Sequence, residues 1–157
     1  RGETWTKAIR YFRNSSLLTE EFIDKFAGYL RLHAKRLEEK GGDERLQSNW
    51  CILENSGLFE IAMALPQDED TRRWASLALR RIRDSVRIQV YEDGSQWEQS
   101  PMYHNEVFHC LCCVVYLARA NGIRLDPGLE ETVHRMALAD VIWRKTGWLP
   151  VYTGRFR

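Results

Sequence analysis

Residues 43–66 read DERLQSNWCILENSGLFEIAMALP and set the fold class of the chain. This stretch lies between a glycine pair and Pro66, which are typical of helix ends. Apolar residues recur within it at the three- and four-residue spacing of an amphipathic helix. We therefore predict a helix that begins near Asp43 and ends near Leu65. Its predicted apolar face consists of Leu46, Trp50, Leu53, Leu58, Ile61 and Ala62.

The same helical spacing continues on both sides of this stretch. Thr19 is a candidate N-cap, and Ser100 and Asp126 each precede a proline, which is favoured at the first helical position because it has no N–H to satisfy. The sequence thus predicts an all-α domain of antiparallel helical hairpins joined by short loops. The tail, with Trp148 and Tyr152, is expected to be a loop or strand. Further helices are expected over residues 19–39, 70–90, 101–120 and 127–145.

The composition excludes several classes of protein. The chain has 157 residues, of which 44% are hydrophobic, so it can bury a core as one domain without disulfides. Lys and Arg number 23 against 22 Asp and Glu, whereas a dedicated nucleic-acid binder usually has a basic excess. No uncharged stretch is long enough to span a bilayer.

Most cysteines, histidines and arginines receive structural interpretations. No cysteines have the paired spacing of a zinc site, so we interpret them as small buried hydrophobic side chains. The arginines of the 70–90 helix are expected to form a solvated face. The histidines are expected in the core or on the surface. The cysteines are Cys51, Cys110, Cys112 and Cys113, the histidines are His33, His109 and His134, and the arginines are Arg72, Arg73, Arg80, Arg83 and Arg87.

The loop before Pro101 differs from an ordinary connection between helices, because it carries large aromatic and amide side chains. Aromatic faces stack on the C–H groups of sugars, and amides form hydrogen bonds with sugar hydroxyls. The loop therefore predicts a carbohydrate-binding cleft. Its members are Tyr91, Gln96, Trp97, Glu98 and Gln99, followed by Tyr103 and His104 in the next helix.

Two segments resemble the heparinase II/III-like polysaccharide lyases, a family that includes heparin and heparan sulfate lyases and oligoalginate lyases. Residues 90–104 read VYEDGSQWEQSPMYH and resemble the family signature. Residues 48–66 are similar to the helix that carries the family's catalytic asparagine. The resemblance covers roughly residues 45–122 and implies part of an (α/α) toroid followed by a β-domain.

The resemblance also implies a setting for the chain. Residues 1–157 are expected to be a single partial toroid domain, a fragment that is inactive by itself. The β-domain, with a structural metal, is expected beyond it, so no cofactor is expected in this chain. A periplasmic or secreted location in bacteria is implied as well, with a uronic-acid polysaccharide or oligosaccharide as the binding partner.

The implied reaction is β-elimination at a uronic acid, in which a proton leaves C5 next to the carboxylate. A side-chain amide, here Asn49 by resemblance, accommodates the negative charge that develops on that carboxylate. By the same resemblance Tyr103 is the general acid, and also the base for substrates of one stereochemistry. Some members have a histidine base directly after the asparagine, where this chain has Trp50, and a further catalytic histidine or tyrosine is expected beyond this chain.

The remaining predicted site residues bind substrate or support the loop. His104 either contacts substrate or holds Tyr103 in place, and Glu98 supports the loop. The predicted substrate-binding residues are Trp50, Trp97, Gln99 and His104.

Two other functions stay open at this point. A glycoside hydrolase would use a carboxylate pair such as Glu54 and Glu98, facing each other at roughly 5–10 Å. A non-catalytic helical module would bind glycans or a protein partner through Trp50, Trp97 and Tyr103.

Overall fold

The computed structural model describes residues 2–41 and 45–145, and within them the chain is all α-helical. The only β pairing in the described residues is an isolated bridge between Val90 and Gln96. The predicted all-α class is confirmed, whereas the expectation that these helices form part of an (α/α) toroid stays a prediction. Among the described helices, none combines the length and apolar character needed to cross a bilayer. The six helices are α1 (Gly2–Phe12), α2 (Glu20–Lys40), α3 (Asn49–Ala64), α4 (Glu69–Gln89), α5 (Pro101–Ala120) and α6 (Pro127–Lys145).

Most helix ends follow the predicted capping residues. The Thr19 side chain accepts a hydrogen bond from the backbone N–H of Phe22 at 3.2 Å, which starts α2. Helices α5 and α6 begin at the two predicted prolines. Helix α1 lies outside the ranges predicted from sequence, although Trp5, Ile9 and Phe12 have helical spacing. Asp43, Trp148 and Tyr152 lie outside the described residues.

Helix α3 begins later than predicted, and part of its predicted apolar face was wrong. It starts at Asn49, where the Ser48 side chain accepts a hydrogen bond from the Trp50 N–H at 3.3 Å. Leu46 precedes the helix, because its carbonyl oxygen accepts hydrogen bonds from α4 side chains instead of from α3. Trp50 is 62% exposed and Leu53 is also exposed, so neither belongs to the core.

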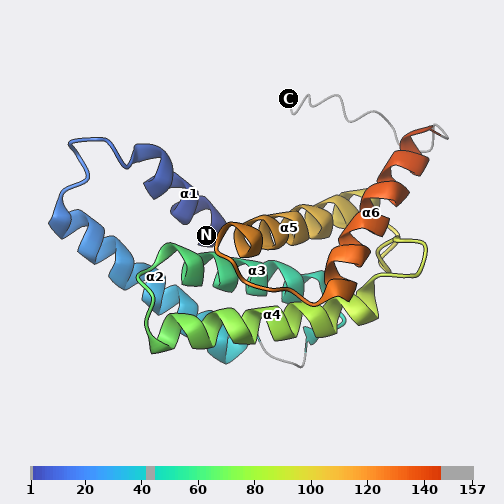
Figure 1. The fold of residues 1–157 in the computed structure, drawn as a ribbon, viewed down its shortest axis with the longest axis horizontal. Helices are drawn as coiled ribbons and strands as arrows, with labels where there is room; N and C mark the ends of the chain where they lie inside the picture. Colours follow the sequence, from blue (N-terminus) through green and yellow to red (C-terminus); the bar gives the residue numbers. More distant parts are fainter. Residues whose placement is uncertain (1, 42–44, 146–157) are drawn as a thin grey trace.

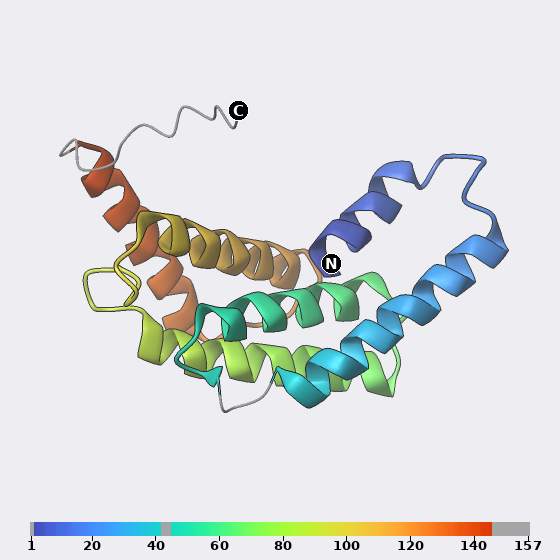
Figure 2. The same ribbon diagram turned by 180° about the vertical axis from the view of Figure 1, so that it is seen from behind.

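Helix α3 is the central element of the fold, with α4 on one side and α5 on the other (Figures 1 and 2). Helices α1 and α2 also pack against it. A helix enclosed by neighbours buries side chains on most of its faces, which explains why α3 buries residues outside the single apolar face predicted from its sequence. Its fully buried apolar side chains include Ile52, Leu58, Phe59 and Ile61, which join Trp74 and Ile82 of α4 and Leu111 of α5.

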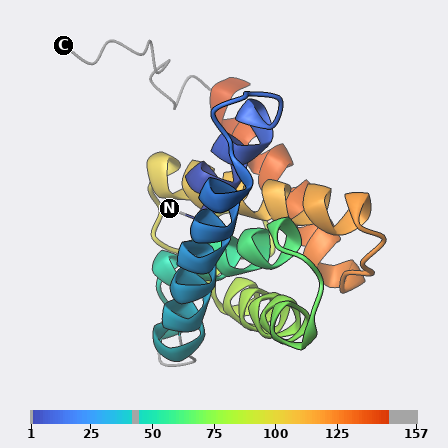
Figure 3. The same ribbon diagram turned by 90° about the vertical axis from the view of Figure 1, so that its left-hand side faces the viewer.

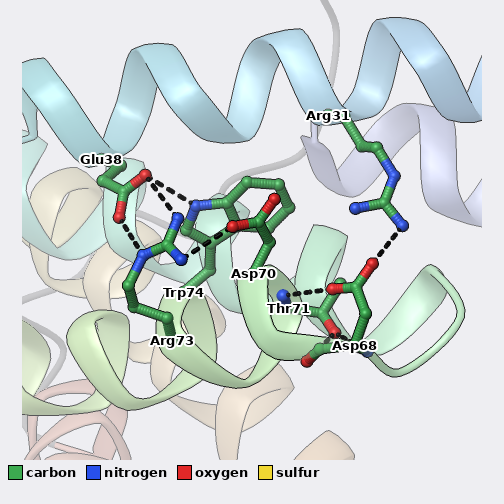
Figure 4. A network of polar contacts seen from close by, with 7 residues as sticks. All are labelled: Arg31, Glu38, Asp68, Asp70, Thr71, Arg73 and Trp74. Atoms are coloured by element: carbon green, nitrogen blue, oxygen red, sulfur yellow. Dashed lines mark hydrogen bonds and ion pairs between the residues drawn. The ribbon is translucent and has the colours of Figure 1, made fainter.

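Helix α2 crosses α4 steeply and is joined to it by polar contacts. Figure 3 shows α4 nearly end-on while α2 runs lengthwise in the view. The Glu38 carboxylate accepts hydrogen bonds from Arg73 at 2.8 Å and from the Trp74 indole at 2.9 Å (Figure 4). Nearby, Arg31 pairs with Asp68 at 2.6 Å. The arginine face of α4 is therefore largely solvated, as predicted, but Arg73 also takes part in an ion-pair network.

Asp68 links this network to the start of α4, and its titration makes a testable prediction. The N–H of Thr71 and the Arg31 guanidinium stabilise the ionised carboxylate, which lowers the pKa of Asp68 from 3.8 to about 2. Because the carboxylate of Asp68 has a lower pKa in the folded state, it stabilises the folded protein. This stabilisation is complete above the ordinary pKa of 3.8 and is lost as the pH falls through the folded-state value of about 2. We expect the urea midpoint difference between wild type and Asp68→Asn to shrink between pH 5 and pH 2.

The neighbouring substitution Glu69→Gln is the control, because it changes charge in the same helical turn without touching the cap. A midpoint difference for Asp68→Asn that stays constant over this pH range would contradict the assigned ion pair. Asparagine retains the ability to cap a helix, so the comparison isolates the charge.

Candidate functional site

The predicted site residues gather at one end of the helical stack. Helices α3 and α5 run in the same direction, and the C-terminus of α4 meets their N-termini at this end (Figures 1 and 2). Residues 91–100 form the loop that connects α4 to α5 here. As a result Asn49, the first residue of α3, and Tyr103, in the first turn of α5, are both carried by helix starts at this end of the molecule.

Buried amides join α3, α4 and the loop in a closed series of hydrogen bonds. The Gln89 amide nitrogen of α4 donates to the Ser48 carbonyl at 2.8 Å. The Gln89 side-chain oxygen accepts a long hydrogen bond of 3.5 Å from the Gln96 amide nitrogen. The Gln96 oxygen accepts the Glu98 N–H at 2.9 Å. The Asn49 amide then donates to the Glu98 carboxylate at 3.0 Å, which closes the series. We call Ser48, Asn49, Gln89, Gln96 and Glu98 the amide circuit.

The amide circuit fixes the start of α3 against the loop. Gln89 and Gln96 are completely or almost completely buried, and a buried amide stabilises the fold only when it is paired. The backbone adds to this, because the Trp97 N–H donates to the Gln89 carbonyl at 2.8 Å. Glu98 therefore lies in the supporting position that the sequence predicted for it.

The loop has a tight conformation that packs against α6. Gly94 has a φ of +86°, and a Cβ at this position would lie 2.9 Å from the Met136 nitrogen and overlap the backbone of Arg135. The Asp93 carboxylate accepts hydrogen bonds from the Ser95 hydroxyl at 2.6 Å and from the Ser95 N–H at 2.8 Å, which close the turn and lower the pKa of Asp93. The loop is therefore constrained by two neighbouring elements and is not a free connection.

The predicted aromatic and amide residues differ in accessibility. Trp50, Trp97, Gln99 and Tyr103 are exposed, Tyr103 by 41%. Asn49 is only 6% exposed, and its amide pairs with Glu98. The accessible side chains are thus the aromatic ones, with the amide beneath the surface. The catalytic and substrate-binding roles of these residues stay predictions.

His104 lies in the interior. It is 1% exposed, its Nε2 is 3.2 Å from the Met136 carbonyl oxygen, and its ring meets Trp143 edge-on at a centroid distance of 4.6 Å. Burial lowers the pKa of His104. This position agrees with the alternative in which His104 supports Tyr103, because contact with a substrate would require α6 to move.

Gln89 was missed as part of this site by the sequence analysis. It lies three residues after Val86 and seven after Ile82, so it occupies the inward face of the 70–90 helix. A polar residue at an inward position was the available indication, since buried amides need partners. Its partners, however, come from two other segments of the chain.

The two carboxylates considered for a glycoside hydrolase have separate partners. Glu54 pairs with Arg45 at 3.3 Å, and Glu98 accepts from Asn49. No hydrogen bond or ion pair joins the two carboxylates to a shared group within residues 2–41 and 45–143.

The local electrostatics favour an anion at this end. The N-terminus of a helix carries partial positive charge and unpaired N–H groups. Ser100 makes no side-chain cap hydrogen bond, so the first-turn N–H groups of α5 lack a side-chain acceptor. The N-termini of α3 and α5 lie at this end together with the C-terminus of α4, whose partial negative charge offsets part of theirs.

Comparison with known proteins gives the family. The family described as Heparinase II/III N-terminus matches residues 1–144. The chain belongs to this family. It is 24% identical over 133 residues to a heparin-sulfate lyase of Bacteroides stercoris, and 28% identical over 93 residues to a heparin-sulfate lyase of Pedobacter heparinus.

The family match extends well beyond the resembling segments and includes α1 and α6. The alignments cover 83% and 59% of this chain but only 20% and 14% of the two relatives. The chain thus spans about a fifth or less of the length of these heparin-sulfate lyases. No solved structure matches the chain significantly.

Proposed function

We propose that the protein acts in the cleavage of uronic-acid-containing polysaccharides by β-elimination, with heparan-sulfate-type glycans as the substrate class. The observation that carries this proposal is the Asn49 carboxamide, held by Glu98 at the end of the molecule where α5 presents Tyr103. The names of the two relatives support the substrate class.

The proposed chemistry assigns one task to each side chain. A base removes the C5 proton, the C4–O4 bond breaks, and a C4=C5 double bond forms. Negative charge develops on the uronate carboxylate as the proton leaves, and an N–H of Asn49 stabilises it. Tyr103 donates its phenolic proton to the leaving O4, because a phenol is protonated at neutral pH.

The paired Asn49 amide retains a donor for this task. A carboxamide nitrogen carries two hydrogens, and Glu98 accepts one of them. The second has no hydrogen-bond partner among the described residues. Glu98 is therefore a positioning residue that sets the orientation of the amide. Because Asn49 is largely buried, a uronate must approach it at the narrow exposed edge beside the loop.

The two helix starts add a second, non-specific contribution. A uronate or sulfate group is an anion, and partial positive charge at a helix N-terminus stabilises an anion by about 0.3–1 kcal/mol at an exposed site. The balanced net charge of the chain, +1, does not provide such an attraction, so it must come from local features.

The test uses the complete natural protein with four glycans: heparan sulfate, hyaluronan, chondroitin and alginate. A lyase forms an unsaturated uronate, and we expect ultraviolet absorbance to rise with heparan sulfate. No rise with any of the four glycans would contradict the proposed reaction. Products with saturated ends would indicate the glycoside hydrolase instead. A response to alginate alone would exclude heparan-type glycans as the substrate class. The periplasmic or secreted location stays a separate prediction, which this experiment does not address.

A second function, binding without catalysis, is favoured by the exposed aromatic side chains. Trp50, Trp97 and Tyr103 all present surface to solvent. A binding module would retain heparan sulfate on an affinity column without releasing unsaturated products. Retention that requires Trp97 but is accompanied by no turnover would support this alternative.

A further inference from the structure

A mixed group of metal-ligating side chains lies far from the Asn49 end. Oε1 of Glu3 in α1 contacts Nε2 of His109 in α5 at 3.0 Å. The Cys113 sulfur lies 3.7 Å from the same His109 nitrogen. One ligand atom from each residue lies within 4.8 Å of the other two.

The backbone brings these donors together without strain. His109 and Cys113 are four residues apart on α5 and therefore share one face of the helix. Helix α1 supplies the third donor, and its start is fixed by the close approach of Gly2 to the Gly57 backbone of α3, where an added Cβ would lie 2.8 Å from an oxygen. The three donors thus come from two helices that α3 holds in place.

Two of the three distances between the donors, those that involve His109, are close to the edges of a tetrahedral site. Zinc binds nitrogen and oxygen at about 2.0–2.2 Å and sulfur at about 2.3 Å, so neighbouring ligands in a tetrahedron lie about 3.4–3.6 Å apart. The observed separations of 3.0 and 3.7 Å differ from these by a few tenths of an ångström. The third separation, between Glu3 and Cys113, is within 4.8 Å, so side-chain rotations must adjust these two donors when an ion binds.

A buried carboxyl group provides a second, independent observation. Glu60 of α3 is 5% exposed, and Ser56 contacts it at the long distance of 3.5 Å. Burial raises the pKa of Glu60 to about 7. Glu60, Cys113 and Lys7 line one cavity of about 520 Å³. A bound cation at this cavity would favour the ionised form of Glu60, which has no ion pair among the described residues.

Three basic side chains, Lys7, Arg10 and Arg13, line this cavity and oppose a cation there, and Lys7 is the one that contacts a proposed ligand. Its ammonium group pairs with Oε1 of Glu3, the same oxygen that contacts His109. The second oxygen of Glu3 has no hydrogen bond or ion pair among the described residues. A metal ion that binds Oε1 of Glu3 must displace Lys7, whereas an ion that binds the second oxygen leaves the ion pair between Lys7 and Glu3 in place.

We propose that Glu3, His109 and Cys113 form a binding site for a divalent cation of the zinc class, which fastens α1 to α5. The combination of imidazole, carboxylate and thiol is suited to zinc and cobalt, and far less to magnesium or calcium, which prefer oxygen donors alone. Of the three proposed ligands, Cys113 also lines the cavity that contains Glu60. The site lies outside the predicted lyase residues, so it is independent of the proposed reaction.

The test is a titration of the purified protein with Co²⁺, whose bond to a thiolate gives a charge-transfer band in the near ultraviolet. We expect this band in wild type and its loss in Cys113→Ser. His109→Ala removes a second ligand and is expected to weaken Co²⁺ binding by about a hundredfold or more. Zn²⁺ should raise the melting temperature of wild type but not that of Cys113→Ser.

Cys112→Ser is the matched control, because Cys112 adjoins Cys113 on the same helix and has no place in the group. It should retain the band in full. Absence of the band in folded wild type, or a band that survives Cys113→Ser, overturns the site. Circular dichroism establishes that each variant is folded, and Cys113→Ala serves if the serine variant does not fold.

Discussion

Replacing Tyr103 by phenylalanine is expected to reduce kcat/KM for the β-elimination by about 10²–10⁴-fold while glycan binding remains. The substitution removes one oxygen, and with it the proton that the proposed mechanism delivers to O4. The ring, which can stack on a sugar, is retained. Because no hydrogen bond to the Tyr103 hydroxyl occurs within the described residues, the variant should keep the wild-type melting temperature. Steady-state kinetics of the complete natural protein with heparan sulfate measure the change.

The control is Tyr29→Phe, which removes the same atom from an exposed tyrosine of α2 that has no place in the candidate site. It should leave kcat/KM within about twofold of wild type. Equal activity of Tyr103→Phe and wild type would remove Tyr103 from the mechanism. Loss of binding together with activity would point to a role in holding the glycan.

Replacing Gly94 by alanine is expected to lower the free energy of unfolding by about 2–5 kcal/mol, or to displace the loop from α6. The residue has a φ of +86°, where a side chain costs about 1–2 kcal/mol. The new methyl group would also overlap the Arg135 backbone, and forcing extra atoms into a packed site costs about 1–3 kcal/mol. The overlapping atoms of Arg135 belong to the backbone of α6, which cannot rotate away from the new methyl group as a flexible side chain could.

Gly122→Ala separates the two contributions. Gly122 also has a positive φ, +66°, but no atom lies within 4 Å of its added Cβ. Its cost should therefore be the conformational part alone, about 1–2 kcal/mol. Denaturant unfolding of both variants measures the difference. Similar losses for the two would mean that the loop does not pack closely on α6.

Helix positions could be predicted where the determining interactions are local. Pro101 and Pro127 mark the starts of α5 and α6 by their own backbone chemistry, and the structure confirms both. The start of α3 could not be predicted in this way. The carbonyl of Leu46 accepts hydrogen bonds from Ser85 and Gln89, which lie about forty residues later in the sequence.

The candidate site shows the same division between local and distant causes. The aromatic and amide residues of the loop, and the family resemblance, indicated which residue types gather there. The contact between Asn49 and Glu98 joins two segments that are 49 residues apart. The spacing of residues along the sequence cannot predict such a contact. The burial of His104 depends likewise on α6, which packs over it from a later part of the chain.

The enclosure of α3 determines the order in which the protein opens. Its backbone amides are screened by neighbours on several sides, so their exchange with deuterium requires those neighbours to separate first. Helix α1 lies at the edge of the stack and is therefore expected to open before α3 does. The slowest-exchanging hydrogens should therefore lie in α3, and protection there reports the stability of the whole domain.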